Sequence, residues 1–436
     1  MSEIATRYLF YQAEQLSRDE ITSLQTERLP QAVARALKSP WYAEQLAGLN
    51  SEQITSLELL RDLPFTTKED LRSGMPFGFL AVPLDQVVRM HYSSGTTGTA
   101  TAIYHTADDL QHWAECVARG MLRVGVTSED VFQNMMGYGL FTGGLGLHYP
   151  AELIGCLTIP AGAGNTSRQI EIMKTFGTTA LHILPSYGLR LAHSCREAGV
   201  VPQRDLNLRF AFVGAEPHSP QTRARLEQAL DLKAYNVYGL SEMCGPGVAV
   251  ECPAQEGLHL REDHYLAEIV DPDSSQPLSD GEEGELVLTT LTRQATPLLR
   301  YRTRDITNII PQPCPCGSQH RRIAPIVGRT DDMLIVRGTN VYPVQIERIL
   351  MAIPEIGSSY LIALETVDEM DEVTVSVEIS ADYSYDDSRE LQALRDRIRQ
   401  ELQTELIFRP QVELVEPGSL PAGEGKAVRV VDRREK

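Results

Sequence analysis

The alternation of apolar and polar positions divides the chain into regions of different predicted secondary structure. From Glu3 to about Leu60, apolar residues recur at three- and four-residue spacing, which predicts helices that Pro30 and Pro40 interrupt. From Asp130 to Thr290, short apolar runs such as "ALHILP" and "RFAFVGA" alternate with helical stretches such as "SRQIEIMKTFG". This rhythm predicts an α/β unit with parallel strands.

The pattern changes in the last third of the chain. From His264 to Pro311, extended runs flank a loop rich in Pro, Asp, Ser and Gly, which predicts a small β subdomain. After Gly328 to Asp332, a helix ("VQIERILMAI"), a strand ("TVSVEIS") and a second helix follow. We therefore expect a large N-terminal α/β domain over residues 1–328 and a small C-terminal α+β domain over residues 329–436.

The net charge and the distribution of apolar residues indicate which kinds of partner the protein can bind. The net charge of −19 disfavours nucleic acid as a partner, because nucleic-acid binders usually present a basic field. No apolar run approaches the length of a membrane span, and the first twenty residues mix charges instead of forming a signal-peptide core. We expect a cytoplasmic protein that acts on small molecules, without a membrane partner.

One loop is a candidate phosphate site. Small hydroxyl residues and two glycines occupy eight of the nine positions from Ser93 to Thr101, where "TAIYHT" begins, which reads as a strand returning from a hairpin. Glycine lets backbone N–H groups approach an anion, and hydroxyls add donors. An ordinary polar turn is the alternative. No lysine follows Gly98, so the loop is not a Walker loop, which disfavours a P-loop kinase or GTPase.

The cysteines suggest a metal site. The chain has seven cysteines with irregular spacing, which does not resemble a disulfide framework. Cys314 and Cys316 form a C-x-C clip, and Cys252 and His259 lie about sixty residues earlier, so three thiolates and one imidazole could hold a structural Zn²⁺. Unrelated reduced thiols are the alternative, and His264 and His320 are competing ligands. The other thiols expected in the core are Cys116, Cys156 and Cys195.

Several compact motifs, taken in order, resemble the adenylate-forming superfamily, and in particular its phenylacetate–CoA ligase family. These motifs cover nearly the whole chain from about residue 60 and are "LPFTTKEDLR", "SSGTTG", "YGLFTGGLGLHYPAE", "GAEP", "YGLSE", "YRTRD", "CPCG", "GRTDDMLIVRGTNVYP" and "GKAVRV". The resemblance implies an AMP-forming acid–thiol ligase with a mobile C-terminal lid domain. Its substrates would be ATP, coenzyme A and an aryl acid, with phenylacetate as the leading candidate.

Two alternatives stay open. The enzyme could adenylate another aryl acid, or pass the acyl group to an acceptor other than CoA. A non-catalytic nucleotide-binding protein is the alternative of another class, because Thr99 stands where the family usually has a lysine. Family relatives are often dimers, so a homodimer is also open.

The resemblance assigns an ATP site. Glu242 would hold Mg²⁺, and Asp305 would accept hydrogen bonds from the ribose hydroxyls. The phosphate loop would consist of Ser93, Ser94, Gly95, Thr96, Thr97, Gly98 and Thr99. The residues around the adenine, ribose and phosphates would be Gly214, Ala215, Glu216, Pro217, Asn236, Val237, Tyr238, Gly239, Ser241 and Arg329.

The resemblance also assigns the moving parts and the acid pocket. Lys426 would bridge the carboxylate and the α-phosphate, and Asp331 would be the hinge of the lid domain. The CoA tunnel would be lined by Arg337, Gly338 and Tyr342. The acyl pocket would be lined by Tyr138, Phe141, Gly214, Ala215 and Pro246.

Overall fold

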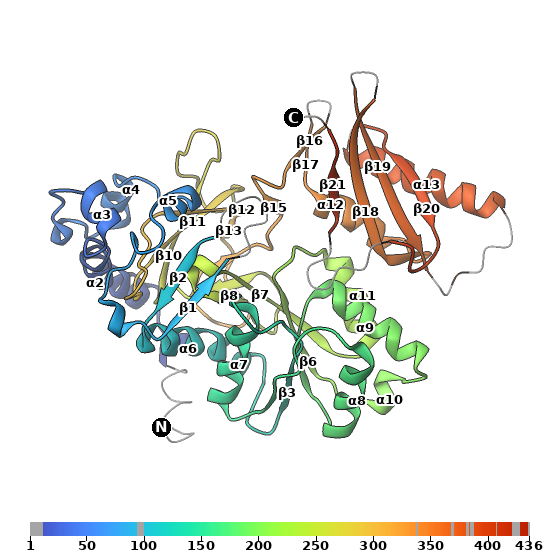
Figure 1. Cartoon of the computed structure of the whole chain (residues 1–436), viewed down its shortest axis with the longest axis horizontal. Helices are drawn as coiled ribbons and strands as arrows, with labels where there is room; N and C mark the ends of the chain where they lie inside the picture. The colour runs from blue at the N-terminus through green and yellow to red at the C-terminus, as the bar shows by residue number, and fades with distance from the viewer. Residues whose placement is uncertain are drawn as a thin grey trace.

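The computed structural model describes residues 12–93, 100–336, 339–367, 370–380, 383, 388–406, 408–420 and 428–434. Figure 1 shows a large N-terminal part, coloured blue to yellow, and a smaller C-terminal part in orange and red. None of the helices within these ranges has the length and apolar character needed to cross a bilayer.

The largest sheet in the described residues has nine strands and forms the centre of the N-terminal part. Its strands β4, β3, β5, β6 and β7 are parallel, as the sequence predicts, and β8, β9, β14 and β13 continue it in antiparallel order. Across the sheet, the strands are Ile309–Ile310 (β13), Arg322–Ile323 (β14), Leu258–Leu260 (β9), Gly245–Glu251 (β8), Lys233–Leu240 (β7), Phe210–Gly214 (β6), Ala180–Ile183 (β5), Val131–Asn134 (β3) and Leu157–Ile159 (β4).

Helices cover both faces of this sheet because successive strand residues point to opposite sides. On β6, Phe212 packs with one group of helices, whereas Ala211 and Val213 pack with the other. The first group is Ala107–Arg123 (α6) and Gly143–Ile154 (α7), and the second is Thr166–Phe176 (α8), Pro185–Glu197 (α9) and Pro220–Leu230 (α11), with the short Pro202–Asp205 (α10) beside it. Cys116, Cys156 and Cys195 are buried, as predicted.

A second sheet in the N-terminal part packs against the first helices of the chain. It contains Tyr265–Val270 (β10), Gly284–Thr290 (β11), Tyr301–Thr307 (β12) and Gly328–Arg329 (β15). The helices nearby are Arg18–Ala36 (α2), Pro40–Gln45 (α3), Leu57–Arg61 (α4) and Lys68–Ser73 (α5), and the predicted hairpin is formed by Arg89–Tyr92 (β1) and Ala102–His105 (β2). Pro40 begins α3, but Pro30 lies inside α2, so the predicted break at Pro30 is wrong.

The C-terminal part has α+β structure. A sheet of order β20-β19-β18-β21 packs its buried residues against two helices. The elements are Leu334–Val336 (β16), Thr339–Val341 (β17), Pro343–Ala352 (α12), Ile356–Val367 (β18), Met370–Ile379 (β19), Ser388–Leu406 (α13), Gln411–Val415 (β20) and Val430–Asp432 (β21). Helix α12 and strand β18 contact α11 and α9 of the N-terminal part, next to the carboxyl ends of the parallel strands (Figure 1).

Candidate active site

The candidate adenine-binding segments lie at the carboxyl ends of β6 and β7. Gly214, the last residue of β6, is paired with Val237 of β7. A Cβ atom at Gly214 would lie 2.3 Å from the Val237 carbonyl oxygen, so the two strands fit this closely only with glycine there. Ala215 then takes a left-handed φ of 65°, and both Ala215 and Pro217 are exposed. The chain therefore turns sharply and presents this loop at the strand ends, where parallel sheets bind ligands.

Tyr238, Asp305 and Arg329 meet beside this loop. The Tyr238 hydroxyl donates to Oδ2 of Asp305 over 2.5 Å, and Nη1 of Arg329 donates to Oδ1 over 3.2 Å. Asp305 and Arg329 are also register partners of β12 and β15. Each carboxylate oxygen has a second lone pair, so Asp305 can still accept from a diol.

The Asp305 carboxyl group is buried among charges of both signs. Burial raises its pKa to about 6, although Arg329 and the Tyr238 hydroxyl act in the opposite direction. Asp331 and Glu242 also raise it, so these carboxylates are close enough to interact. Asp331 accepts a hydrogen bond from Nε of Arg329 over 2.8 Å and is exposed, which ties the predicted hinge to the predicted ribose site.

Glu242 lies in a short 3₁₀ turn, Ser241–Met243, directly after β7. Its side chain is 6% exposed, and its Oε1 has no hydrogen-bond partner among the described residues. Nζ of Lys68 lies 3.4 Å from this oxygen. A buried carboxylate oxygen without a hydrogen bond is a suitable ligand for Mg²⁺, which prefers oxygen. The preceding residue, Ser241, contacts the Thr142 hydroxyl at 3.5 Å.

Two predicted nucleotide-site residues have internal partners. The Glu216 carboxylate accepts a hydrogen bond from the Ser186 backbone nitrogen over 2.6 Å, and burial raises its pKa. The Asn236 backbone nitrogen donates to Glu251 over 2.8 Å. These contacts fix the backbone around the candidate adenine site, while the Gly239 backbone packs on β8, where a Cβ atom would lie 1.8 Å from the Gly245 carbonyl oxygen.

The predicted acyl-pocket residues other than Gly214 and Ala215 come from two places that adjoin. Pro246 on β8 accepts a hydrogen bond at its carbonyl oxygen from Nε1 of Trp113, and its ring lies where a Cβ atom of Gly146 on α7 would be. Tyr138 lies in the loop before α7, and its hydroxyl is 3.1 Å from Nδ1 of His148. Phe141 in the same loop is 50% exposed. Gly146 and Trp113 were not singled out from sequence, because a lone glycine and a tryptophan on a helix face read as ordinary packing.

Several predicted site residues lie outside the described residues. They are Ser94, Gly95, Thr96, Thr97, Gly98 and Thr99 of the loop, Arg337 and Gly338 of the predicted CoA tunnel, and Lys426. Ser93 is described: its hydroxyl lies 2.9 Å from that of Thr101, which closes the base of the loop. Tyr342 packs its ring over Gly328, at the start of the predicted hinge segment.

The predicted zinc ligands gather at one place. The ligand atoms of Cys252, His259, Cys314 and Cys316 all lie within 4.8 Å of one another. The sulfurs of Cys252 and Cys314 are 3.5 Å apart, and Cys316 Sγ is 3.4 Å from Nε2 of His259. Two sulfurs on one tetrahedral zinc lie about 3.8 Å apart, since each Zn–S bond is about 2.3 Å. The donor set and its spacing therefore fit Zn²⁺ with four protein ligands.

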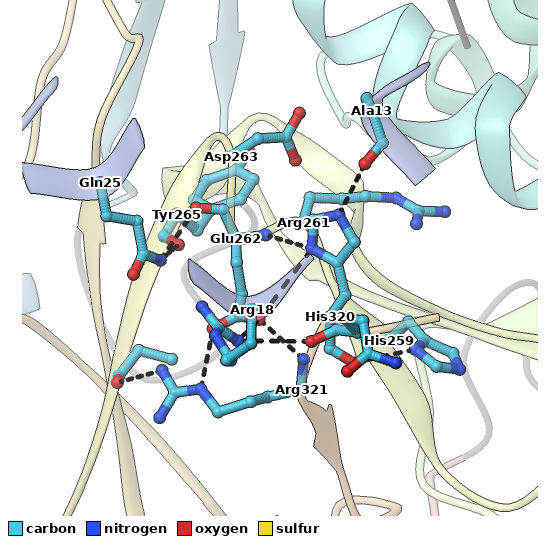
Figure 2. A network of polar contacts seen from close by, with 12 residues as sticks. Ala13, Arg18, Gln25, His259, Arg261, Glu262, Asp263, Tyr265, His320 and Arg321 are labelled. Atoms are coloured by element: carbon cyan, nitrogen blue, oxygen red, sulfur yellow. Dashed lines mark hydrogen bonds and ion pairs between the residues drawn. The ribbon is translucent and has the colours of Figure 1, made fainter. Parts of the chain in front are cut away.

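Figure 2 shows a polar network that includes His259 of this cluster and His320, one of the two competing histidines. Nδ1 of His259 is 3.1 Å from the His320 carbonyl oxygen, which leaves Nε2 free to face the thiols. Nε2 of His320 is 3.1 Å from the Ala13 carbonyl oxygen. His264 contacts Thr292 and Asp263 instead. Of the three histidines considered from sequence, the cluster contains only His259.

The parallel sheet, the acidic residues at its strand ends and the small C-terminal α+β domain are typical of a class of enzymes. In this class, a nucleotide binds where the parallel sheet meets the C-terminal domain. The chain belongs to the AMP-binding enzyme family: residues 13–292 match the AMP-binding enzyme model, and residues 338–434 match the model of the AMP-binding enzyme C-terminal domain. The chain is similar to phenylacetate-coenzyme A ligase of Thermus thermophilus, with 43% identity over 97% of this chain and 98% of that protein. It is 41% identical to phenylacetate-coenzyme A ligase of Pseudomonas putida, over 99% and 98% of the two chains.

Solved structures of one ligase allow a finer comparison. The chain is similar to 2-hydroxyisobutyryl-CoA ligase in the postadenylation state, with a TM-score of 0.90, 28% identity, and coverage of 96% of this chain and 91% of that one. Against the same ligase in the thioesterification state with CoA, the TM-score is 0.71 at 30% identity, over 97% and 92% of the chains. Since both structures are of one protein, the lower score reflects a different arrangement of its parts.

Proposed function

We infer that this chain is an AMP-forming ligase that adenylates an aryl acid, with phenylacetate as the leading substrate, and transfers the acyl group to coenzyme A. The observation that carries this proposal is the group in which Tyr238 of β7 and Arg329 donate to Asp305, with the buried Glu242 in the turn directly after β7. The similarity to phenylacetate-coenzyme A ligases at about 40% identity over nearly the full chain gives the substrate class.

A carboxylate is a poor electrophile, so the reaction first has to activate the acid. The acid's carboxylate oxygen attacks the α-phosphorus of ATP, and the bond to pyrophosphate breaks, with the electron pair leaving on the pyrophosphate oxygen. The acyl-adenylate is a mixed anhydride that the CoA thiol opens, with release of AMP. The protein needs no nucleophile of its own; it has to orient the reactants and stabilise charge.

In this proposal, particular residues orient the reactants and stabilise the charge. Asp305 accepts hydrogen bonds from the ribose hydroxyls, and Tyr238 offers its ring face to the adenine. Glu242 would hold Mg²⁺, which when bound neutralises phosphate oxygens. Lys426, which lies outside the described residues, would place its ammonium between the acid carboxylate and the α-phosphate.

The two parts of the chain would take two relative positions. We place the domain boundary between residues 328 and 329 and the hinge at Asp331. In the arrangement described here, which scores higher against a postadenylation state than a thioesterification state, α12 and β18 lie on α11 and α9. Rotation about Asp331 would then open the path for CoA past residues 337–342.

Three finer points belong to the same proposal. The cluster of Cys252, His259, Cys314 and Cys316 would hold one structural Zn²⁺, because four protein ligands leave no open position. A homodimer is proposed on the resemblance alone. A cytoplasmic location is proposed because ATP and CoA, the two cosubstrates, are used there.

A panel of carboxylic acids in an ATP–pyrophosphate exchange assay tests the function. Phenylacetate and its ring-substituted relatives should drive exchange, and the acyl-CoA should appear only when CoA is added. Exchange without acyl-CoA formation would favour an amine, a carrier thiol or another acceptor. No exchange with any acid, together with nucleotide binding, would favour a non-catalytic nucleotide-binding protein.

A further inference from the structure

Two residues near the amino terminus, Ala13 and Glu14, are each linked to the predicted zinc ligands through one intermediate residue. We call these ligands the thiol cluster, which consists of Cys252, His259, Cys314 and Cys316. The first link runs through His320. Its Nδ1 accepts a hydrogen bond from the Glu262 backbone nitrogen over 3.4 Å, so the ring proton lies on Nε2, which donates to the Ala13 carbonyl oxygen over 3.1 Å. The His320 carbonyl oxygen accepts from Nδ1 of His259 over 3.1 Å (Figure 2).

The second link runs through Arg123 on α6. Nη1 of its guanidinium donates to Sγ of Cys316 over 3.1 Å, and Nη2 forms an ion pair with the Glu14 carboxylate. The side chains of Arg123 and Glu14 are only 15% and 10% exposed. Because the guanidinium is a rigid planar fork, one arginine can hold the carboxylate and the sulfur in a fixed relative position.

The charged side chains around Glu14 have an excess of positive charge. The side chains in contact there are Arg119, Arg123, Arg261, Glu14 and Asp263. Three arginines and two carboxylates leave one positive charge. A zinc ion bound by three thiolates and a neutral imidazole carries one negative charge in total. Arg123 lies where these two groups of opposite charge meet, so its contact with Cys316 is favourable when the metal is bound.

We propose that Arg123 and His320 are positioning residues of the zinc site, and that through them Ala13 and Glu14 determine how tightly the metal is held. This inference rests on the zinc site of the proposed function and deepens it. Arg123 donates to the Cys316 sulfur and offsets the charge of the thiolate, which keeps another lone pair for the metal. The His320 carbonyl oxygen fixes the ring proton of His259 on Nδ1, so the lone pair of Nε2 stays directed at the metal.

The test measures the zinc affinity of the full-length protein by competition with a chelator of known affinity. We expect Arg123→Gln to weaken zinc binding about 10- to 100-fold, since loss of a side chain that contacts a metal ligand has an effect of this size. Arg123→Lys keeps the charge but not the fork, so it should lose less affinity than Arg123→Gln. Glu14→Gln leaves Arg123 without its charged anchor, and His320→Phe removes the donor to Ala13. Both of these variants should also bind zinc more weakly than the wild type.

Cobalt spectra distinguish an effect on the metal site from a loss of folding. Co²⁺ bound in place of zinc gives a thiolate-to-metal charge-transfer band, whose energy responds to a hydrogen bond at the sulfur. Arg123→Gln should therefore shift this band. Arg209→Gln is the matched control, because Arg209 forms an ion pair with Asp130 at 3.1 Å and belongs to neither link. This variant should leave both the band and the zinc affinity unchanged.

The outcomes that contradict this inference differ from those that contradict the proposed reaction. Unchanged zinc affinity in Arg123→Gln and His320→Phe would overturn the positioning role, even if the melting temperature fell. Unchanged affinity in Glu14→Gln would overturn the dependence on the amino-terminal residues. A wild-type protein that binds no zinc would overturn the zinc site itself. Failure of the pyrophosphate exchange assay would overturn the proposed adenylation and leave this inference standing.

Discussion

Glu347 on α12 binds the amino end of helix α11 across the boundary between the two parts of the chain, because its Oε1 accepts a hydrogen bond from the Thr222 hydroxyl over 2.5 Å. The same oxygen accepts from the Ser219 backbone nitrogen over 3.0 Å, and Oε2 accepts from the Tyr360 hydroxyl over 3.0 Å. Ser219 follows the loop that carries Glu216 and Pro217. A buried carboxylate of the C-terminal part is therefore bonded directly beside the candidate adenine site.

Glu347→Ala is expected to disfavour the domain arrangement that forms these bonds. We expect adenylation, measured by pyrophosphate exchange, to fall about tenfold, since a hydrogen bond to a charged group contributes about 1.5–3 kcal/mol. Cleavage of supplied acyl-adenylate by CoA should not fall, because that step would use the other arrangement. Glu405→Gln, which removes an exposed partner of Arg348 within the C-terminal part, is the matched control. Equal losses in both half-reactions would contradict this role for Glu347.

The Asp305 carboxyl group should make nucleoside binding depend on pH. Burial raises its pKa to about 6, so the group takes up a proton as the pH falls through that value and loses acceptor capacity for the ribose diol. Adenosine affinity should be constant above about pH 7 and fall up to tenfold for each pH unit below 6. Adenosine is the suitable probe because it has no phosphate that titrates in this range.

Asp305→Asn should bind adenosine weakly at every pH, with a flat profile. A wild-type profile that is flat between pH 5 and pH 8 would show that Asp305 does not accept from the ribose. Thermal unfolding of both proteins across the same pH range serves as the control for folding.

The thiol cluster should contain about one zinc per chain in protein purified without added metal. Cys316→Ser should reduce the zinc content severely and lower the melting temperature by several degrees, because metal binding by a preformed site adds to the free energy of unfolding. Cys156→Ser, at a buried cysteine outside the cluster, should keep the zinc. Elemental analysis that finds no zinc in the wild type would remove the site.

Lys426→Ala should cut acyl-adenylate formation by at least a hundredfold and leave cleavage of supplied acyl-adenylate nearly unchanged. The prediction rests on the "GEGKAVRV" motif, because Lys426 lies outside the described residues. Rapid-quench measurement of each half-reaction checks it. A comparable loss in both half-reactions would mean that the lysine stabilises the protein instead of the adenylation transition state.

The parallel strands were predictable because each is a short apolar run between amphipathic helices. Pro30 was not predictable from local rules. A proline inside a helix costs about 3 kcal/mol, but Leu29 and Val33 beside it are buried in the core, and this packing outweighs the local cost. In the C-terminal part, β18 was missed because its residues 360–364 are all apolar or aromatic, so the sequence does not show the alternation of its buried positions.

The site was predictable only in part. Motifs that follow strands, such as those with Glu216 and Tyr238, could be located because strand ends meet at one edge of a parallel sheet. The approach of Lys68 to Glu242 joins positions far apart in the sequence, and it depends on the bridge between Thr66 and Tyr301. No local pattern records such a bridge, although the motif that contains Lys68 was itself recognised.

The N-terminal segment has a consequence for proteolysis. Glu14 accepts hydrogen bonds from Arg119 and Arg261 and pairs with Arg123, and these cations hold its pKa well below the usual range against the effect of burial. A protease that removed the first fifteen residues would leave this group of arginines with one counter-charge fewer, beside the thiol cluster. We therefore expect limited proteolysis of the amino terminus to yield a stable fragment that still contains Ala13 and Glu14. A cut beyond Glu14 would destabilise the protein, although it lies far from the candidate active site.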